Sequence, residues 1–545
     1  MMSNSETRWG VAAALTSFLL LGGCSFLIDT NKLQKGGSAG AAGQAGSGGA
    51  LDAGDDVSDA GGADVSQPDA DAAPGCTDDL ACLDDDPCTV DTCNLTSGKC
   101  EHSPFQGIGL VNESMVGSGQ DYTAIVQPGV DQIGLPVLTA DGESFWLGYW
   151  YEVGSGTSGA SRDVVIKHYQ ATPSAAPVEA SLKSGSFSLD DLFTSPALVV
   201  RQFKSLGDAG VTAKRLAVVV GGDVTGAGAG VYVRMLDPDS LQPAGSTVVP
   251  PMLQGGMSPS DFADPVNSAP AALVMDDHLV FTWVYGAKLY TWDAHLGGVV
   301  NQTAEKHDVP NDVLNAVPIQ GTNIGFKADF GAVLEIAKTG GIYSTDLWTH
   351  GNDQTLKNLE PNSGARLGVA AGAFLDPPDD LSIVAWSYES ATGPVIKSGG
   401  AVCGGTDCNA AAFPGNSSSN EGAGMYPAIS STWLSAYSTV RGVAISQVLH
   451  KRDGADAGAA YSAVIATAMA LDPNADAGST QSYVNPPVLL VRGPVASASD
   501  KPKDSPYGHT AIAVTASGSI MVAWVEKDNG KMSLRARRYG TKQCN

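Results

Sequence analysis

The stretch HTAIAVTASGSIMVAWVEKDNGKMSLRARRY, from His509 to Tyr539, determines how this chain folds. A first apolar segment leads through a turn at Gly518 to a second one that ends at Trp524, and a third segment follows from Leu534. Short apolar runs bounded by turn residues are typical of β-strands, and tight turns between them favour antiparallel pairing. We therefore expect a small antiparallel sheet of three or more strands.

The same pattern recurs between residues 107 and 541, where no convincing amphipathic helix is found. Seven copies of the middle segment are recognisable, and they centre on Trp150, 215–220, Trp283, 330–336, Trp386, 433–437 and Trp524. Third segments follow at 164–169, 230–236, 288–292, 341–343 and 534–539. The stretch 451–482 is rich in Asp, Ala and Gly and is interpreted as an insertion.

This repetition predicts an all-β fold, a β-propeller of about seven blades, with six to eight compatible with the spacing. A single core rarely exceeds about 300 residues, whereas a ring of small sheets lets a longer chain bury its apolar faces. The strand 122–126 precedes the first full unit, and we expect it to pair with the last unit and close the ring. Two tandem β-sandwiches are the alternative.

The charge of the chain is strongly acidic and uneven. The 545 residues carry 57 acidic and 31 basic side chains, a net charge of -26, which argues against nucleic acid as a partner. Residues 36–75 contain Gly, Ala or Asp at 29 of 40 positions and no aromatic residue. Such a segment buries too little apolar surface to fold, so 24–75 is expected to be a disordered tether.

The N-terminus has the pattern of an export signal. Arg8 precedes the apolar run 11–21, which is shorter than a membrane span and ends in Leu-Gly-Gly-Cys24. This ending resembles the bacterial lipobox. The resemblance implies that residues 1–23 are removed as a lipoprotein signal peptide and that Cys24 is lipidated. Ser25 follows Cys24, which by the same resemblance favours the outer membrane; an ordinary signal peptide is the alternative.

Eight cysteines remain besides Cys24, and five of them fall within 25 residues. That density in an exported chain predicts a disulfide-rich module at 76–104 rather than a zinc site, because no Cys-x2-Cys pair occurs there. The cysteines expected in disulfides are Cys76, Cys82, Cys88, Cys93, Cys100, Cys403, Cys408 and Cys544. Cys403 and Cys408 are expected to pair with each other, and Cys544 with the module.

The segment DPCTVDTC, residues 86–93, followed by GKCEHSP, residues 98–104, resembles a short repeat found in extracellular proteins of myxobacteria and slime moulds. The resemblance implies a surface module without a catalytic role. His102 near its end could ligate a metal, but as a single histidine on a small module it is interpreted as a packing residue.

No motif for catalysis or cofactor binding stands out. The eight histidines show no metal-pair spacing, and no Gly-x-Ser-x-Gly elbow occurs in a strand–turn–helix setting. The glycine run 221–230 lacks the end of a phosphate-binding loop and is interpreted as a connection between strands. Asp376 to Asp380 is interpreted as a hairpin turn, with a calcium site as the alternative. We therefore predict no catalytic residue, no metal ligand and no cofactor.

These observations favour a lipid-anchored binding or adhesion protein of the outer membrane, facing the periplasm or the cell surface. Its expected ligand is a glycan or an extracellular protein, its expected contact with the membrane is the N-terminal lipid, and the chain is expected to be a monomer. The alternative is a secreted hydrolase or lyase that acts on a carbohydrate through residues scattered over the loops of the ring.

Overall fold

The computed structural model describes residues 75–544, apart from positions within 77–87 and segments between the strands, the longest of which are 114–122, 245–269, 296–304, 321–329, 411–422 and 472–479. Cys24, the expected signal peptide and the expected tether lie outside the described residues, as does the Asp376–Asp380 turn. Every named element in the described part is a strand. No helix there has the length and apolar character needed to cross a membrane.

In the described part of the chain, seven antiparallel sheets of four or five strands form blades 1 to 7. Blade 1 contains β5 (Gln132–Ile133), β6 (Val137–Asp141), β7 (Ser144–Val153), β8 (Ser161–Tyr169) and β9 (Val178–Ser181). Blade 2 contains β10 (Leu189–Leu192), β11 (Ala197–Lys204), β12 (Thr212–Val224) and β13 (Gly228–Leu236). Blade 3 contains β14 (Ala271–Met275), β15 (His278–Tyr285), β16 (Lys288–His295) and β17 (Glu305–His307).

Blades 4 to 6 follow in chain order, and blade 7 combines strands from both ends of the propeller sequence. Blade 4 contains β18 (Asp312–Gln320), β19 (Phe330–Lys338), β20 (Ile342–Thr349) and β21 (Leu356–Ser363). Blade 5 contains β22 (Arg366–Ala373), β23 (Leu381–Glu389), β24 (Ile396–Gly404) and β25 (Asp407–Ala410). Blade 6 contains β26 (Ala423–Leu434), β27 (Val440–Arg452), β28 (Ala459–Leu471), β29 (Thr480–Ser482) and β30 (Val488–Ser497). Blade 7 contains β31 (Tyr507–Val514), β32 (Ile520–Asp528), β33 (Lys531–Cys544), β3 (Gly107–Glu113) and β4 (Thr123–Val130).

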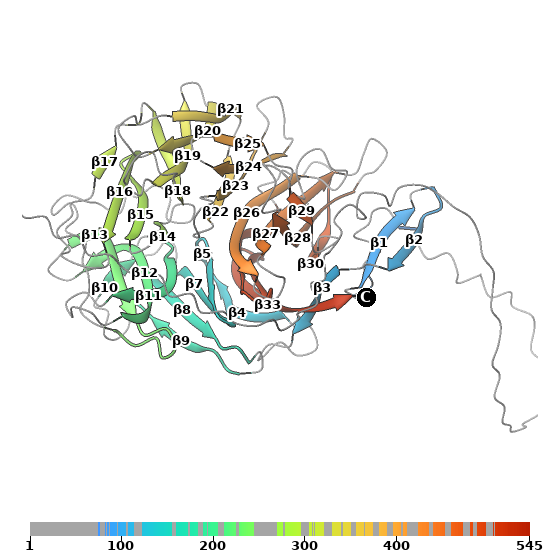
Figure 1. Ribbon diagram of the computed structural model, residues 1–545, viewed down its shortest axis with the longest axis horizontal. Coiled ribbons are helices and arrows are strands. Elements are labelled where there is room, and N and C mark those ends of the chain that lie inside the picture. Colours follow the sequence, from blue (N-terminus) through green and yellow to red (C-terminus); the bar gives the residue numbers. More distant parts are fainter. Residues whose placement is uncertain are drawn as a thin grey trace, which may run out of the picture. The chain divides into compact units, whose positions relative to one another are not determined.

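The inner strands of the blades form a closed circle. Each of β6, β11, β14, β18, β22, β26 and β31 contacts the next in this order, and β31 contacts β6 again. Figure 1 shows the blades following one another around the ring in sequence order. A closed ring of small sheets is a β-propeller, so the predicted fold class is confirmed. The strand pairing rules out the alternative of two tandem sandwiches.

Both ends of the propeller sequence meet in blade 7. Strand β33 pairs with β4 through its first half, with Arg535 opposite Ile125, and with β3 through its second half, with Gly107 opposite Cys544. The closing role expected of 122–126 is therefore confirmed, and β3 adds a second closing strand that the sequence analysis missed. Contacts across the seam add to the closure: Ser517 Oγ donates to Glu143 Oε2 at 2.6 Å, and Lys531 pairs with Asp131.

In the blades whose middle-strand side chains are described, that strand is buried on both faces, which explains the continuous apolar runs in the sequence. In β7, Phe145 and Leu147 belong to the cluster shared with blade 7, whereas Trp146 and Trp150 belong to the cluster shared with blade 2. This alternation follows from the two-residue period of a strand. The buried Trp150 indole also donates to Leu192 O of blade 2 at 2.9 Å.

The sequence assignment of blade 6 was wrong in two places. Trp433 lies on the first strand, β26, and the middle strand is β27, so the copy centred on 433–437 was misplaced by one strand. The stretch interpreted as an insertion contains β28, which pairs with β27 over twelve consecutive residue pairs from Arg441–Leu471 to Arg452–Ala460. Small residues dominate β28, so its period-two pattern gives a weak apolar signal. The glycine run 221–230, interpreted as a connection, lies mostly within the strands themselves: 221–224 belong to β12 and 228–230 to β13.

Candidate functional site

The cysteine module contains a short hairpin of β1 (Thr89–Asn94) and β2 (Lys99–Pro104). Gly98 closes its turn with a φ of 66°, a conformation that glycine adopts without strain. The Gly98 N–H donates to Asn94 O at 2.7 Å, and Gly98 O accepts from Cys76 N at 2.8 Å. This turn sets the register, in which Cys93 lies opposite Cys100 and Asp91 lies opposite His102.

Three disulfides hold this hairpin. Cys76 is bonded to Cys93, Cys82 to Cys100, and Cys88 to Cys544. The first two fix the segment before the hairpin against both of its strands. The third joins the module to the end of β33 in blade 7, which places the final cysteine of the chain at the module.

The structure leaves the remaining cysteine assignments as predictions. Cys403 and Cys408 are register partners in the β24–β25 pair, a position compatible with the expected bond, but their side chains lie outside the description. The lipidation of Cys24 also stays a prediction, because residues 1–74 are not described.

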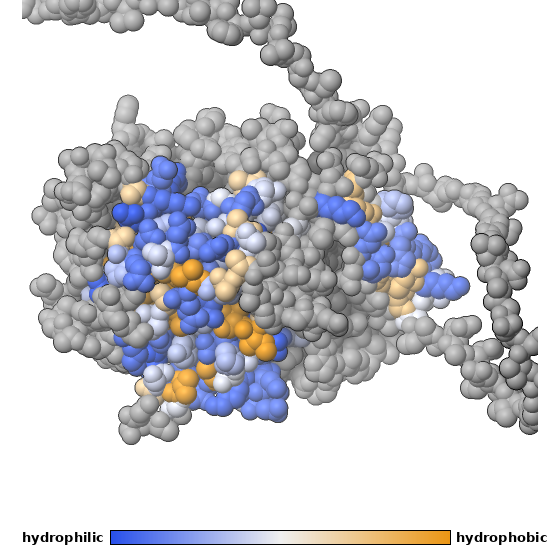
Figure 2. All heavy atoms as spheres, turned by 90° about the horizontal axis from the view of Figure 1, so that it is seen from below, coloured by the Kyte–Doolittle hydropathy of each residue, from blue (hydrophilic) through white to orange (hydrophobic). Residues whose placement is uncertain are grey.

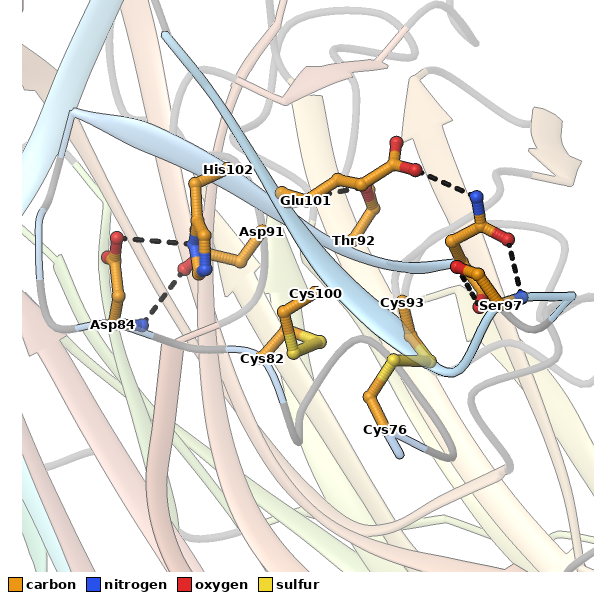
Figure 3. The surroundings of a disulfide bond; sticks show 11 residues. Cys76, Cys82, Asp84, Asp91, Thr92, Cys93, Ser97, Cys100, Glu101 and His102 are labelled. Atoms are coloured by element: carbon orange, nitrogen blue, oxygen red, sulfur yellow. Dashed lines mark hydrogen bonds and ion pairs between the residues drawn. A yellow bond between two sulfur atoms is a disulfide. The ribbon is translucent and has the colours of Figure 1, made fainter. Parts of the chain in front are cut away.

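Asp84, Asp91 and His102 converge on one edge of the module (Figure 3). His102 Nδ1 lies 2.8 Å from Asp91 Oδ1 and 3.2 Å from Asp84 Oδ2. The Asp91 carboxylate is almost completely buried, with 4% of its side chain exposed, whereas about a third of the Asp84 and His102 side chains is exposed. His102 is thus an accessible member of a three-residue cluster and not the isolated packing residue that the sequence suggested.

Hydrogen bonds orient both carboxylates. Asp84 Oδ1 accepts from the Asp86 N–H at 2.8 Å and from the Thr89 hydroxyl at 2.9 Å, and Asp91 Oδ2 accepts from the Asp84 N–H at 3.2 Å. The bond to Asp91 raises the pKa of His102 against the opposing effect of desolvation, and the charges of Asp91 and Asp84 add to the rise. Desolvation acts to raise the pKa of the Asp84 carboxyl, but the hydrogen bonds from Asp86 and Thr89 outweigh it, so this pKa is lowered.

A group of aromatic and polar side chains joins blades 1 and 2 of the propeller. Trp146 of blade 1 stacks on His168 with ring centres 4.7 Å apart, and its indole donates to Pro238 O at 2.7 Å. Lys214 of blade 2 lies 5.4 Å from the centre of the Trp146 ring. Desolvation lowers the pKa of His168, which keeps this buried imidazole neutral. These groups stabilise the boundary between blades 1 and 2.

The described surface is polar and offers few large apolar side chains. On the face shown in Figure 2, hydrophilic residues predominate and the apolar ones form small separate groups. Among the residues with described side chains, only Ile125 and Val153 are large, apolar and exposed, at 54% and 46%. Scattered residues of this kind are normal for a soluble surface and mark no docking patch.

Comparison with known proteins gives similarities at the level of the fold. No family model and no curated protein matches the sequence. A Trypanosoma rangeli sialidase with the inhibitor DANA is 9% identical with a TM-score of 0.32; the match covers 75% of this chain and 55% of the sialidase. The Aleuria aurantia lectin, a six-bladed β-propeller, is 11% identical with a TM-score of 0.32 over 65% of this chain and 96% of the lectin. The chain thus spans about half the length of the sialidase. The number of blades follows from the strand pairing of this chain and not from these similarities.

Proposed function

We propose that this chain is a lipid-anchored binding protein of the outer membrane, in which the propeller is the recognition domain for a glycan or an extracellular protein. Lipid on Cys24 attaches it to the membrane, and the acidic segment before residue 76 separates the module from the lipid. The three disulfides support an oxidising, extracytoplasmic location, because such bonds persist there and are rare in the cytosol.

The observation that carries this proposal is the way in which the module holds the propeller. Gly107, the first residue of β3, is the register partner of Cys544, the last residue of β33. Tension that enters from the N-terminal side therefore reaches β3 at the end where it pairs with Cys544. Without a further link, β3 would separate from β33 one residue pair at a time.

The Cys88–Cys544 disulfide changes this load path. The bond transfers tension directly to β33, which is paired with β32 on one edge and with β3 and β4 on the other. Separation of β3 from β33 then no longer frees the module, because the bond to Cys544 still holds it. A protein that holds a ligand against mechanical force gains from this arrangement, and this supports adhesion over a freely diffusing activity.

Cell fractionation and a binding assay test the proposal. Cells with the wild-type chain should retain it in the outer membrane with lipid label, whereas Cys24→Ala should release it and abolish the label. Wild-type cells should then bind immobilised envelope polysaccharides or matrix proteins more firmly under flow than cells with Cys24→Ala. Release of shortened glycan products without retention of the cells would favour the carbohydrate-acting enzyme instead.

A further inference from the structure

We propose that Asp84, Asp91 and His102 bind one divalent first-row transition-metal ion, for which Zn²⁺ is the best-suited probe. An imidazole nitrogen with two carboxylate oxygens is a donor set that such ions accept. The three donor atoms lie within 4.8 Å of one another. This inference is independent of the propeller's ligand and of lipidation.

The disulfide framework places all three ligands. Asp84 follows Cys82 by two residues, His102 follows Cys100 by two, and Asp91 precedes Cys93 by two. Side chains two apart on a strand share a face, so Asp91 and His102 lie on the face of the hairpin that also carries Cys93 and Cys100. The Cys82–Cys100 bond then brings Asp84 to the same edge. The ligand set is therefore held by covalent links and not only by weak contacts.

The distances within the cluster are close to those between the ligands of one metal ion. Two carboxylate oxygens from different residues face His102 Nδ1, at 2.8 and 3.2 Å, and one N–H makes a strong linear hydrogen bond to only one of them. Ligands about 2.1 Å from a metal are about 3.0 Å apart at right angles and about 3.4 Å apart in a tetrahedron. The Asp84 distance of 3.2 Å lies between these values, and the Asp91 distance of 2.8 Å is slightly shorter than both.

The surroundings of the cluster suit metal binding as well. One oxygen of each carboxylate is held by the hydrogen bonds from Asp86, Thr89 and the Asp84 backbone, which leaves the other oxygen directed toward His102. Partners of this kind orient metal ligands. The exposure of Asp84 and His102 provides an entry path and positions for water ligands. The nearby sulfurs of Cys76, Cys82 and Cys93 are bound in disulfides and are not available as ligands.

The test is metal binding to the full oxidised chain after treatment with a chelator. Titration with Zn²⁺ by calorimetry, and with Co²⁺ by visible absorption, should show one site per chain with nitrogen and oxygen ligands. His102→Gln and Asp84→Asn should each weaken this site at least about tenfold, because each removes a direct ligand. Glu101→Gln is the matched control, since Glu101 lies on the same hairpin and accepts from Asn94 Nδ2, outside the cluster.

Mapping of the Cys82–Cys100 bond in each variant verifies that the module has kept its fold. A site lost in both ligand variants and kept in Glu101→Gln supports the proposal. Absence of Zn²⁺ and Co²⁺ binding overturns it and leaves a hydrogen-bonded histidine–aspartate pair. Binding that survives both ligand variants also overturns it, because the ions would then occupy acidic residues elsewhere.

Discussion

Removal of the Cys88–Cys544 bond tests how the ring is closed. In the double variant Cys88→Ser, Cys544→Ser, both partners are replaced so that no free thiol remains. The bond spans a sequence separation of 456 residues, for which the chain-entropy model gives about 6 kcal/mol of stabilisation. Loss of a native disulfide typically costs about 2–5 kcal/mol. We expect a loss within that range, because the β3–β33 and β4–β33 pairs still bring the ends together.

Urea unfolding followed by tryptophan fluorescence measures this loss, since the module itself contains no tryptophan. The midpoint should fall, and hydrogen exchange should quicken first at Gly107 and its neighbours on β3, where separation from β33 begins. The control is Cys76→Ser, Cys93→Ser, which opens a bond with a sequence separation of only 17 residues inside the module. That control should leave the tryptophan-reported midpoint unchanged. An unchanged midpoint in the Cys88–Cys544 variant would show that strand pairing alone closes the ring.

Three further predictions concern the propeller. Trp150→Ala should cost about 3–5 kcal/mol in urea unfolding, because this indole is fully buried between blades 1 and 2. Deletion of 107–130 removes β3 and β4 and should abolish the cooperative transition, whereas deletion of 36–75 should leave it intact. Desolvation, with a smaller effect of Lys527, lowers the pKa of His509 to about 3 from 6.5. Only the unfolded chain therefore takes up this proton between these values, so stability should be full above pH 6.5 and fall progressively as the pH drops toward 3. Melting curves of His509→Gln should lack this part of the acid dependence.

The sequence predicted the middle and third strands of most blades because those strands are buried on both faces. Ile520 to Val525 are all buried, and such a strand appears as a continuous apolar run that can be recognised without knowledge of its partners. The β3 strand, GIGLVNE, is short and carries two glycines, and its pairing partner lies more than 400 residues away. The role of β3 depends on the closure of the ring, and the local pattern of apolar residues carries no information about that long-range pairing.

The cluster in the module was missed for a different reason. Asp91 and His102 become neighbours through the register of one hairpin, which depends on the turn at Gly98. Asp84 reaches them through the Cys82–Cys100 bond together with the hydrogen bond from its N–H to Asp91. Eight cysteines allow 105 connectivities, so sequence spacing alone cannot place this carboxylate. Each of the three residues lies two positions from a cysteine, and this regular spacing was the only sequence signal for the cluster. It predicts proximity only once the disulfide pairing is known.

The proposed metal site and the closure of the ring meet in the single turn from Asp84 to Cys88. Asp84 Oδ1 accepts from the Asp86 N–H, and Asp86 Oδ1 accepts from the Cys88 N–H at 3.0 Å. An ion on Asp84 Oδ2 would therefore hold the turn that presents Cys88 to Cys544. Coupling of this kind is reciprocal, so the Cys88–Cys544 bond would also strengthen ion binding by ordering the same turn. The module is in this respect more than a spacer, because it can link the chemistry at its edge to the mechanical integrity of the propeller.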